Sequence, residues 1–293
     1  MLLTDSTSTA ATLGIVPLDD LRLVPAPVQG EPLSRRRGAV AVSDEVLHDP
    51  TAAAELAQLA LLGVRFLRPR EFYERTQRRV MLDGLDESWF LFERPLRPRR
   101  IYEAGKRVID AICGLLGALL VLLVAPVLWL LYRFDDRGPV FFRQERVGRY
   151  GESFIIWKFR TMRVDAEAAG PVWAAKDDAR VTRIGALLRK TRLDEMPQFF
   201  NVLRGEMSLI GPRPERPVFV RTLGRAIPFY DRRHLMRPGI TGWARVRFGY
   251  GDSVTDKWRS HEYDLYYLKH RSVLLDLEIL VRTVMVILLR RGQ

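Results

Sequence analysis

The sequence predicts a mixed α/β, helix-rich protein with one membrane-embedded helix and a small β-α-β appendage ahead of it. Three observations carry this prediction. Residues 111–132 form an uncharged apolar run, residues 38–67 place a helix-forming segment between two short apolar segments, and residues 138–162 alternate like two strands around a glycine turn.

The N-terminal part is predicted to hold one β-α-β crossover. Residues 1–36 are rich in Ala, Pro, Ser and Thr and are expected to be mostly irregular. "GAVAV" (38–42), "AAAELAQLALL" (52–62) and "VRFL" (64–67) then predict strand, helix and strand, a unit too small to stand alone. Because this unit lacks a glycine-rich phosphate loop, we do not expect it to bind a nucleotide.

Residues 72–92 predict a helix, a turn and an aromatic segment. Within them Asp86 and Glu87 precede "SWFLF", which is the setting of an ordinary capping or turn pair. We place the end of the β-α-β domain at residue 93, so that it spans 37–93, and assign 94–293 to a second, larger domain.

The composition favours a polyanionic partner. The chain of 293 residues carries 47 Lys and Arg against 35 Asp and Glu, a formal charge of +12, and 47% of its residues are apolar. Such an excess suits nucleic acid, anionic lipid headgroups or phosphorylated substrates. Nucleic acid is the least favoured partner, since no reader motif accompanies the charge. The single cysteine, Cys113, excludes an intrachain disulfide, and the N-terminus lacks the pattern of a secretory signal.

The apolar run is long enough to cross a membrane. Its 22 residues would extend roughly 33 Å as a helix, against a hydrocarbon core of about 30 Å. Pro126 interrupts the run, at a cost of ~3 kcal/mol unless the helix bends. Both flanks are basic, which favours keeping both ends on the cytoplasmic face. We therefore expect a re-entrant helix over about 107–133, with a full span and a buried core helix as alternatives.

Beyond this helix the pattern predicts a hairpin around Gly148 and Gly151, and a short amphipathic helix over 184–191. The segment 273–291 is apolar but contains three charged residues, which suits either an interfacial helix or a packed amphipathic one.

The stretch "RLDEMPQFF" places Asp194 and Glu195 among many cations. Phosphoryl transfer uses this combination, because cations and a divalent metal neutralise phosphate oxygens while a carboxylate acts as ligand, base or nucleophile. Pro197 suits the first turn of a helix that starts near Asp194, so Asp194 as an ordinary N-cap is the alternative. Two stiff loops, "GPRP" (211–214) and "RPGITGW" (237–243), follow.

Residues 101–290 resemble, in unbroken order, the monotopic polyprenyl-phosphate phosphoglycosyl transferases of bacteria, which initiate exopolysaccharide and O-antigen assembly. The segments that carry the resemblance are "KRVIDAICGLLGALLVLLVAPV", "GPVFFRQERVGRYGESFIIWKFRTM", "RVTRIGALLRKTRLDEMPQFFNVLRGEMSLIGPRPERP", "RPGITGWARV" and "YDLYYLKHRSVLLDLEIL". Residues 38–92 resemble the end of the Rossmann-like domain of long members. The four transmembrane helices usual at the front of those members are not seen, so we expect a short natural variant or a trimmed chain.

The resemblance implies that a UDP-sugar donates its sugar-1-phosphate to undecaprenyl phosphate, with release of UMP. Asp194 would be the nucleophile that forms a phosphosugar-aspartyl intermediate. Glu195 would be its partner acid, which assists Mg²⁺ binding or deprotonation, and the metal would be held by Asp194 and Glu195. The positions that match substrate-binding residues are Lys158, Arg160, Arg189, Arg213 and Arg237. A membrane scaffold that has lost its chemistry is the alternative function, and the intact dyad disfavours it.

The resemblance also implies a monotopic protein of the bacterial inner membrane, with interfacial helices and a cytoplasmic catalytic domain. Pro126 would supply the break of the re-entrant helix, preceded by Ala125 where the family often has serine. Arg245 stands where the family commonly has glutamine. "RFGYGDSVTDKW" (247–258) is closest to the exopolysaccharide branch, which implies a hexose or N-acetylhexosamine phosphate. The β-α-β appendage would suit a homodimer, since its sheet needs partners.

Overall fold

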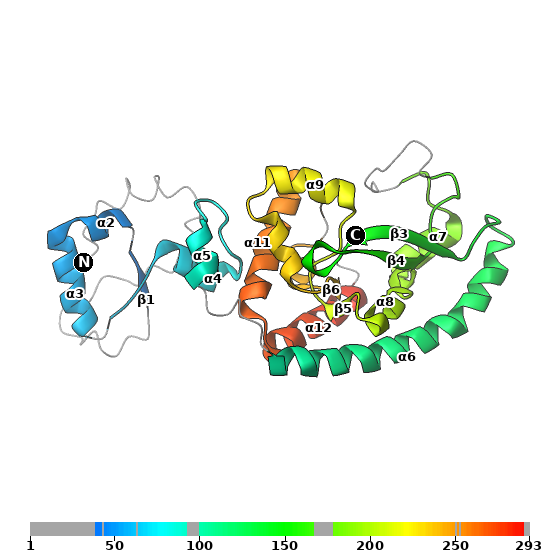
Figure 1. Ribbon diagram of the computed structural model, residues 1–293, viewed down its shortest axis with the longest axis horizontal. Coiled ribbons are helices and arrows are strands. Elements are labelled where there is room, and N and C mark those ends of the chain that lie inside the picture. The colour runs from blue at the N-terminus through cyan, green and yellow to red at the C-terminus, as the bar shows by residue number, and fades with distance from the viewer. Residues whose placement is uncertain are drawn as a thin grey trace. The chain divides into compact units, whose positions relative to one another are not determined.

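The structure is a computed structural model that describes residues 39–42, 44–62, 64–92, 100–166, 178–249, 251 and 253–289. It forms two compact units, Met1–Thr76 and Gln77–Gln293, and each is described by itself (Figure 1). Helices predominate and the sheets are small, which confirms the mixed α/β, helix-rich class. The segment 1–36, expected to be irregular, lies outside the described residues.

The first unit contains two short parallel strands joined through helices. Its elements are β1 (Ala39–Ala41), α2 (Asp44–His48), α3 (Pro50–Leu61), β2 (Arg65–Leu67) and most of α4 (Pro69–Gln77). Val40 is the register partner of Phe66. The order strand, helix, strand agrees with the sequence pattern. That the unit is a fragment of a Rossmann-like domain, and that it supports a homodimer, stay predictions.

The second unit holds the remaining elements. They are α5 (Glu87–Phe92), α6 (Arg100–Tyr132), β3 (Phe141–Val147), η4 (Arg149–Gly151), β4 (Ser153–Phe159), α7 (Arg183–Thr191), η5 (Leu193–Glu195), α8 (Gln198–Arg204), β5 (Ser208–Ile210), α9 (Pro217–Ala226), η6 (Tyr230–Leu235), β6 (Gly239–Thr241), α10 (Trp243–Arg247), α11 (Val254–His270) and α12 (Val273–Leu288). The predicted helices over 184–191 and 273–291 are thus present as α7 and α12.

The segment from Val80 to Trp89 packs in the core of this second unit. Val80 and Leu82 are almost fully buried there, together with Trp243 and Leu265. The predicted domain limits, 37–93 for the β-α-β domain and 94–293 for the larger domain, stay predictions.

The long helix α6 runs along one side of the second unit and curves (Figure 1). It begins at Arg100, earlier than the expected 107, because its first turns are anchored to the unit. Tyr102 donates a hydrogen bond to Asp276 over 2.7 Å, and the carboxylate of Asp110 accepts one from the backbone N–H of Leu209 over 2.9 Å. The helix continues through Pro126 as one element.

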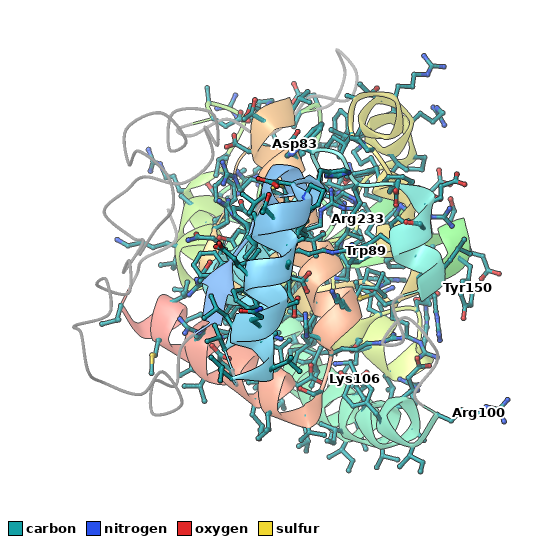
Figure 2. All side chains as sticks on the ribbon, turned by 90° about the vertical axis from the view of Figure 1, so that its left-hand side faces the viewer. Asp83, Trp89, Arg100, Lys106, Tyr150 and Arg233 are labelled. Carbon is teal, nitrogen blue, oxygen red and sulfur yellow. The ribbon has the colours of Figure 1, made fainter. Side chains whose placement is uncertain are left out.

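One face of α6 is apolar and uncovered. Its most apolar 18 residues have a mean hydropathy of 2.7, and 28% of them are buried in the protein. Large side chains such as Leu116 and Leu123 are more than half exposed. Figure 2 views α6 nearly end on, with Arg100 pointing away from the protein and Lys106 toward it. An exposed apolar face of this size is typical of a surface that contacts a membrane or another protein.

The predicted hairpin forms from β3 and β4, which pair antiparallel with Val147 opposite Ser153. The turn takes the left-handed conformation at Tyr150 and Gly151, with φ of 58° and 82°. Gly151 adopts this conformation without strain, as the glycine pattern predicted.

A second small sheet brings the two stiff loops together. Strands β5 and β6 pair in parallel. The chain that leaves β5 is tied to β6 by hydrogen bonds from Gly211 N to Thr241 O and from Gly239 N to Pro212 O, both 2.9 Å. A Cβ on Gly239 would lie 2.1 Å from the backbone nitrogen of Gly211. Only glycine permits this approach.

Two histidines of the second unit lie near a fixed charge, Arg233, His261 buried and His234 half-buried. Burial and the nearby guanidinium lower the pKa of His261 to about 3 and that of His234 to about 4. Both values lie below the ordinary 6.5, so the unfolded chain binds these protons more readily than the folded one. Above pH 6.5 both histidines are neutral in the folded and the unfolded chain, so they do not weaken the fold. Stability is lost as the pH falls from 6.5 toward 4, because only the unfolded chain then gains protons.

We therefore expect the free energy of unfolding to fall by up to about 1.4 kcal/mol per pH unit for each of these histidines below pH 6.5. Urea unfolding in detergent at pH 7.5 and pH 5.0 measures this. His261→Gln should reduce the loss, because glutamine has no proton to gain, whereas the matched change at the exposed His270 should leave it unchanged. An equal pH dependence in both variants would contradict the assignment to His261.

Candidate active site

The acid pair lies in a tight turn between two helices. Helix α7 ends where Arg192 takes the left-handed conformation, with φ of 57°. This residue reverses the chain, so that η5 carries Asp194 and Glu195 to the entrance of α8. The helix expected to start near Asp194 begins only at Gln198, because Pro197 occupies its N-cap position. No side-chain cap is formed at either helical start, so the N-cap interpretation of Asp194 is wrong.

Helix α8 is fastened to α6 and to the hairpin, which fixes the turn in front of it. Arg107 of α6 donates to the carbonyls of Val202 and Leu203 over 2.6 and 2.7 Å at the C-terminal end of α8. The ring of Phe199 lies where a Cβ on Gly117 would stand, 2.2 Å away, so this glycine allows the two helices to meet. The amide of Asn201 bonds the backbone of β4.

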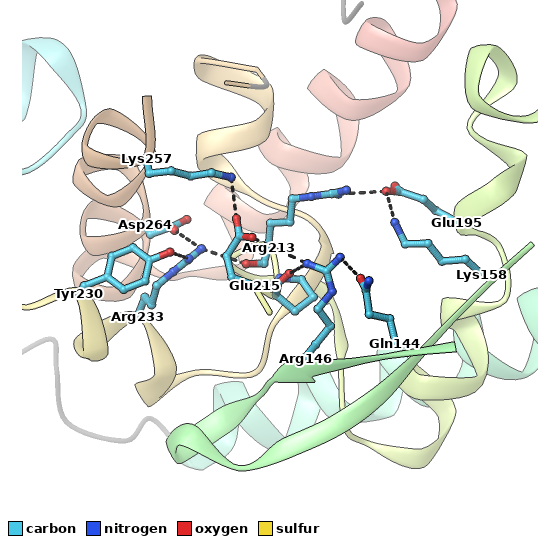
Figure 3. A network of polar contacts seen from close by, with 11 residues as sticks. Gln144, Arg146, Lys158, Glu195, Arg213, Glu215, Tyr230, Arg233, Lys257 and Asp264 are labelled. Carbon is cyan, nitrogen blue, oxygen red and sulfur yellow. Dashed lines mark hydrogen bonds and ion pairs between the residues drawn. The ribbon is translucent and has the colours of Figure 1, made fainter. Parts of the chain in front are cut away.

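Glu195 is buried beneath three cations. Lys158 Nζ and Arg213 Nη1 lie 3.5 and 3.0 Å from its Oε1, as Figure 3 shows, and Arg245 Nη2 lies 2.8 Å from its Oε2. Burial alone would raise the pKa of this carboxyl, but Arg213, Arg245 and Lys158 outweigh burial and hold the pKa well below its usual range. Glu195 is therefore ionised at neutral pH and both of its oxygens are occupied.

Asp194 has the opposite environment. Among the residues that the structure describes, no hydrogen bond or ion pair reaches its carboxylate. Burial and the adjacent charge of Glu195 raise its pKa, while Lys158, Arg213 and Arg189 act in the other direction. An anionic oxygen with no hydrogen-bond partner, next to cations, is a strong nucleophile and a good ligand for a cation.

Lys158 and Arg189 complete the surroundings of the pair. Lys158 comes from β4, and burial lowers the pKa of its ammonium to about 8 although Glu195 opposes this. Arg189, in the last turn of α7, donates from Nε to Thr161 over 3.0 Å. The bond to Thr161 uses only Nε of the guanidinium. The charge of Asp194 acts on the pKa of Arg189, so the two side chains lie near each other.

Two of the predicted substrate-binding residues are held elsewhere. Arg160 is buried and donates to the carboxylate of Asp136 over 2.5 Å and to the carbonyl of Pro139 over 2.8 Å. Arg237 donates from Nε to the carbonyl of Gly205 over 3.0 Å, beyond the C-terminal end of α8 and thus at the opposite end of that helix from the dyad. The structure brings neither guanidinium to the acid pair.

Arg245 is the site residue that the motif pattern did not include. It comes from α10, and besides Glu195 it bonds the carbonyl of Ile240. Its departure from the glutamine common in the resembling family was the available signal. A pocket adjoins this cation and Arg213, bounded by the 239–242 segment and by α11, with Lys257 and Asp264 in its wall.

The residues fit a magnesium ion only through Asp194. Within the described part of the chain no group of three or more His, Cys, Asp or Glu side chains forms a metal site. Mg²⁺ is commonly held by one or two carboxylates together with substrate phosphates, so the free carboxylate of Asp194 suffices. Glu195, predicted as a second ligand, has both oxygens bound to cations in this structure.

Comparison with known proteins gives a consistent family. The model of the family described as bacterial sugar transferase matches residues 101–290. The chain is 41% identical over 246 residues to a UDP-N-acetylgalactosamine-undecaprenyl-phosphate N-acetylgalactosaminephosphotransferase of Aeromonas hydrophila, a match that covers 83% of this chain and 57% of the relative.

Two further relatives extend this comparison. A UDP-glucose:undecaprenyl-phosphate glucose-1-phosphate transferase of Klebsiella pneumoniae is 40% identical, over 66% of this chain and 42% of the relative. An exopolysaccharide production protein PSS of Rhizobium leguminosarum is 42% identical, over 61% of this chain and 92% of the relative. The chain thus spans about half the length of the first two relatives.

Proposed function

We propose that this chain, which belongs to the bacterial sugar transferase family, transfers a sugar-1-phosphate from a UDP-sugar to undecaprenyl phosphate. The relatives named as undecaprenyl-phosphate transferases support both substrates. The reaction would serve exopolysaccharide assembly, which the name of the Rhizobium relative supports.

The observation that carries the proposal is the unequal environment of two adjacent acids. Glu195 is ionised and held by three cations, while the carboxylate of Asp194 is free of partners in the described part of the chain. A nucleophile needs an oxygen with an accessible lone pair, whereas a carboxylate that positions cations needs both of its oxygens bound to them. The arrangement therefore suits Asp194 as the nucleophile and Glu195 as the residue that positions Lys158 and Arg213.

In the first half of the reaction, an oxygen of Asp194 attacks the phosphorus that carries the sugar. The bond from this phosphorus to the bridging oxygen of the diphosphate breaks, UMP leaves, and the sugar phosphate remains on Asp194 as an acyl phosphate. In the second half, an oxygen of undecaprenyl phosphate attacks the same phosphorus, which frees Asp194 and gives undecaprenyl-diphospho-sugar. Lys158, Arg189 and Arg213 stabilise the negative charge on the phosphate oxygens.

We propose Mg²⁺ as the metal, held by Asp194 together with the diphosphate of the donor. The ion would neutralise charge on the diphosphate as UMP leaves. Glu195 would act on the site through its cations, without binding the ion.

The covalent route makes a direct prediction. Incubated with Mg²⁺ and either UDP-glucose or UDP-N-acetylgalactosamine, without lipid, the protein should gain one sugar phosphate on Asp194 and release one UMP. Intact mass and peptide mapping after acid quenching measure the adduct, and UMP release tells which of the two donors is used. UMP release that requires undecaprenyl phosphate and leaves no adduct would contradict this route.

The exposed apolar face of α6 supports insertion into the membrane. We propose that α6 enters the bilayer and returns to the cytoplasmic face around Pro126, with the apolar side chains of α12, such as Leu274 and Val281, at the interface. The helix is continuous at Pro126 in the structure, so the return would rely on its curvature and on a bend of the backbone in lipid.

Labelling of single cysteines tests the two topologies. The native Cys113 is replaced by serine, and cysteine is introduced at Glu103 or at Arg137, on either side of the apolar run. A re-entrant helix predicts that an impermeant maleimide labels both positions only from the cytoplasmic side of inverted vesicles. Labelling of the two positions from opposite sides would establish a full span and overturn the re-entrant topology.

A further inference from the structure

The loop that carries Arg213 is held by its backbone carbonyls. Pro212 O accepts from Gly239 N over 2.9 Å, and Glu215 O accepts from Val147 N over 2.9 Å. Between them, Arg213 O accepts from Arg233 Nη2 over 3.0 Å, and Pro214 O accepts from Arg146 Nη1 over 2.9 Å. Four consecutive carbonyls are thus bound by donors from outside the loop, on three different parts of the second unit.

Arg233 is the more deeply buried of the two side-chain donors, with 5% of its surface exposed. Besides the Arg213 carbonyl, its guanidinium donates to Asp264 over 2.8 Å and to the hydroxyl of Tyr230 over 2.5 Å (Figure 3). Asp264 and Tyr230 are themselves buried. The guanidinium is therefore fixed in direction by its other bonds before it reaches the loop.

The side chain of Glu215 adds a second anchor to the same loop. It lies 2.7 Å from Lys257 Nζ and 3.8 Å from Arg146, and only 7% of it is exposed. Figure 3 shows the result: the loop backbone faces the buried charges, while the side chain of Arg213 extends the other way, to Glu195.

Such an arrangement has a cost that a simple connecting loop would not incur. Arg233, Asp264 and Glu215 are charged and buried, so each of them needs a partner within the protein. Here the bonds that these three groups make all contribute to holding one loop. The prolines at positions 212, 214 and 217 already restrict this backbone. What the buried charges add is a fixed position for one cation, Arg213.

We propose that Arg233 is a positioning residue for the transfer reaction, which acts by holding the Arg213 carbonyl so that the Arg213 guanidinium stays at the acid pair. This inference rests on the proposed function. When a cation is already in position, none of the binding energy of the donor phosphates is used to order its side chain. A small displacement of such a group costs a large factor in rate.

A double-mutant cycle tests the inference. Arg233→Lys keeps the charge beside Asp264, but a single ammonium cannot serve Asp264, Tyr230 and the Arg213 carbonyl in the guanidinium geometry. We expect kcat/KM for the UDP-sugar to fall by about ten- to a hundredfold. In an Arg213→Ala background, the same change should alter kcat/KM less than twofold, because the group through which Arg233 acts is gone.

Hydrogen exchange provides a readout that does not depend on activity. The amides of residues 211–216 should exchange faster in Arg233→Lys than in the unsubstituted protein. Arg232→Lys is the matched control, since the Arg232 side chain is 39% exposed and its carboxylate partner is Asp231. This control should leave both exchange and activity unchanged. If Arg233→Lys does not fold, Tyr230→Phe, which removes one of the bonds that fix the direction of the Arg233 guanidinium, replaces it in both measurements.

The outcomes separate the inference from the function. Unchanged exchange at 211–216, or an equal loss of activity with and without Arg213, would overturn the positioning role. An unsubstituted chain that transfers no sugar phosphate overturns the proposed function, and the exchange measurement then still decides whether Arg233 holds the loop.

Discussion

Asp194→Asn is expected to abolish both UMP release and the covalent adduct. Asparagine keeps the size of the side chain but removes the anionic oxygen that would attack phosphorus, so no aspartyl phosphate can form. We expect the rate to fall by about a thousandfold or more, as for the loss of a nucleophile in other covalent enzymes. Steady-state UMP release and intact mass after quenching measure the two effects.

The chain supplies a matched control in its second "LDE" sequence. Asp86 accepts hydrogen bonds from Ser88 Oγ and from the backbone N–H of Trp89, 2.5 and 3.2 Å away, at the start of α5. Asparagine caps a helix about as well as aspartate does. Asp86→Asn should therefore leave activity unchanged. Normal turnover in Asp194→Asn would remove the basis of the proposed reaction.

The stability of the Asp194 variant carries a second expectation. The pKa of this carboxyl is raised by burial and by the charge of Glu195, so ionised Asp194 weakens the fold at neutral pH. Asparagine removes that charge. We therefore expect Asp194→Asn to unfold at the same temperature as the unsubstituted protein or above it, which distinguishes a chemical defect from a folding defect.

The elements with strong local patterns could be predicted from the sequence. The hairpin follows from alternation and from its two glycines, and the helices α7 and α12 follow from their apolar periodicity. The boundary of α6 could not, because its first turns are held by distant partners such as Asp276 and the amide of Leu209. Tertiary contacts set that end of the helix.

The candidate site could be predicted from the sequence only for residues whose position depends on their near neighbours in the chain. Lys158 and Arg160 are two apart and would share a face of one strand, but β4 ends at Phe159 and Arg160 turns to Asp136. Arg245 reaches Glu195 from 50 positions away, since β6, which precedes α10, pairs with β5. Such a contact depends on sheet topology, which no local pattern contains.

Glu195→Gln is expected to disable the enzyme for a different reason, and to destabilise it. The glutamate neutralises three cations in a site where it is itself only 8% exposed. Removing one partner of a buried ion pair typically costs about 3–5 kcal/mol, because the remaining charges lose their partner while still shielded from water. The amide also brings two N–H donors to a place lined by donors.

The sign of this effect follows from the pKa of Glu195. Because the folded protein holds the pKa well below its usual range, ionised Glu195 stabilises the fold at neutral pH, and that contribution is lost only as the pH falls below the ordinary value near 4.5. Glutamine lacks it at every pH. Thermal unfolding at pH 7.5 should therefore show a lower midpoint in Glu195→Gln than in the unsubstituted protein.

Glu262→Gln is the matched control for this variant. Glu262 is also buried and lies 3.4 Å from Arg79, but burial raises its pKa to about 7, so it is only partly ionised at neutral pH. Glutamine should cost much less there. The two neighbouring acids would then differ in their effect on stability. Asp194→Asn loses activity but not stability, whereas Glu195→Gln loses both. A Glu195→Gln protein as stable as the unsubstituted one would show that the three cations do not depend on this carboxylate.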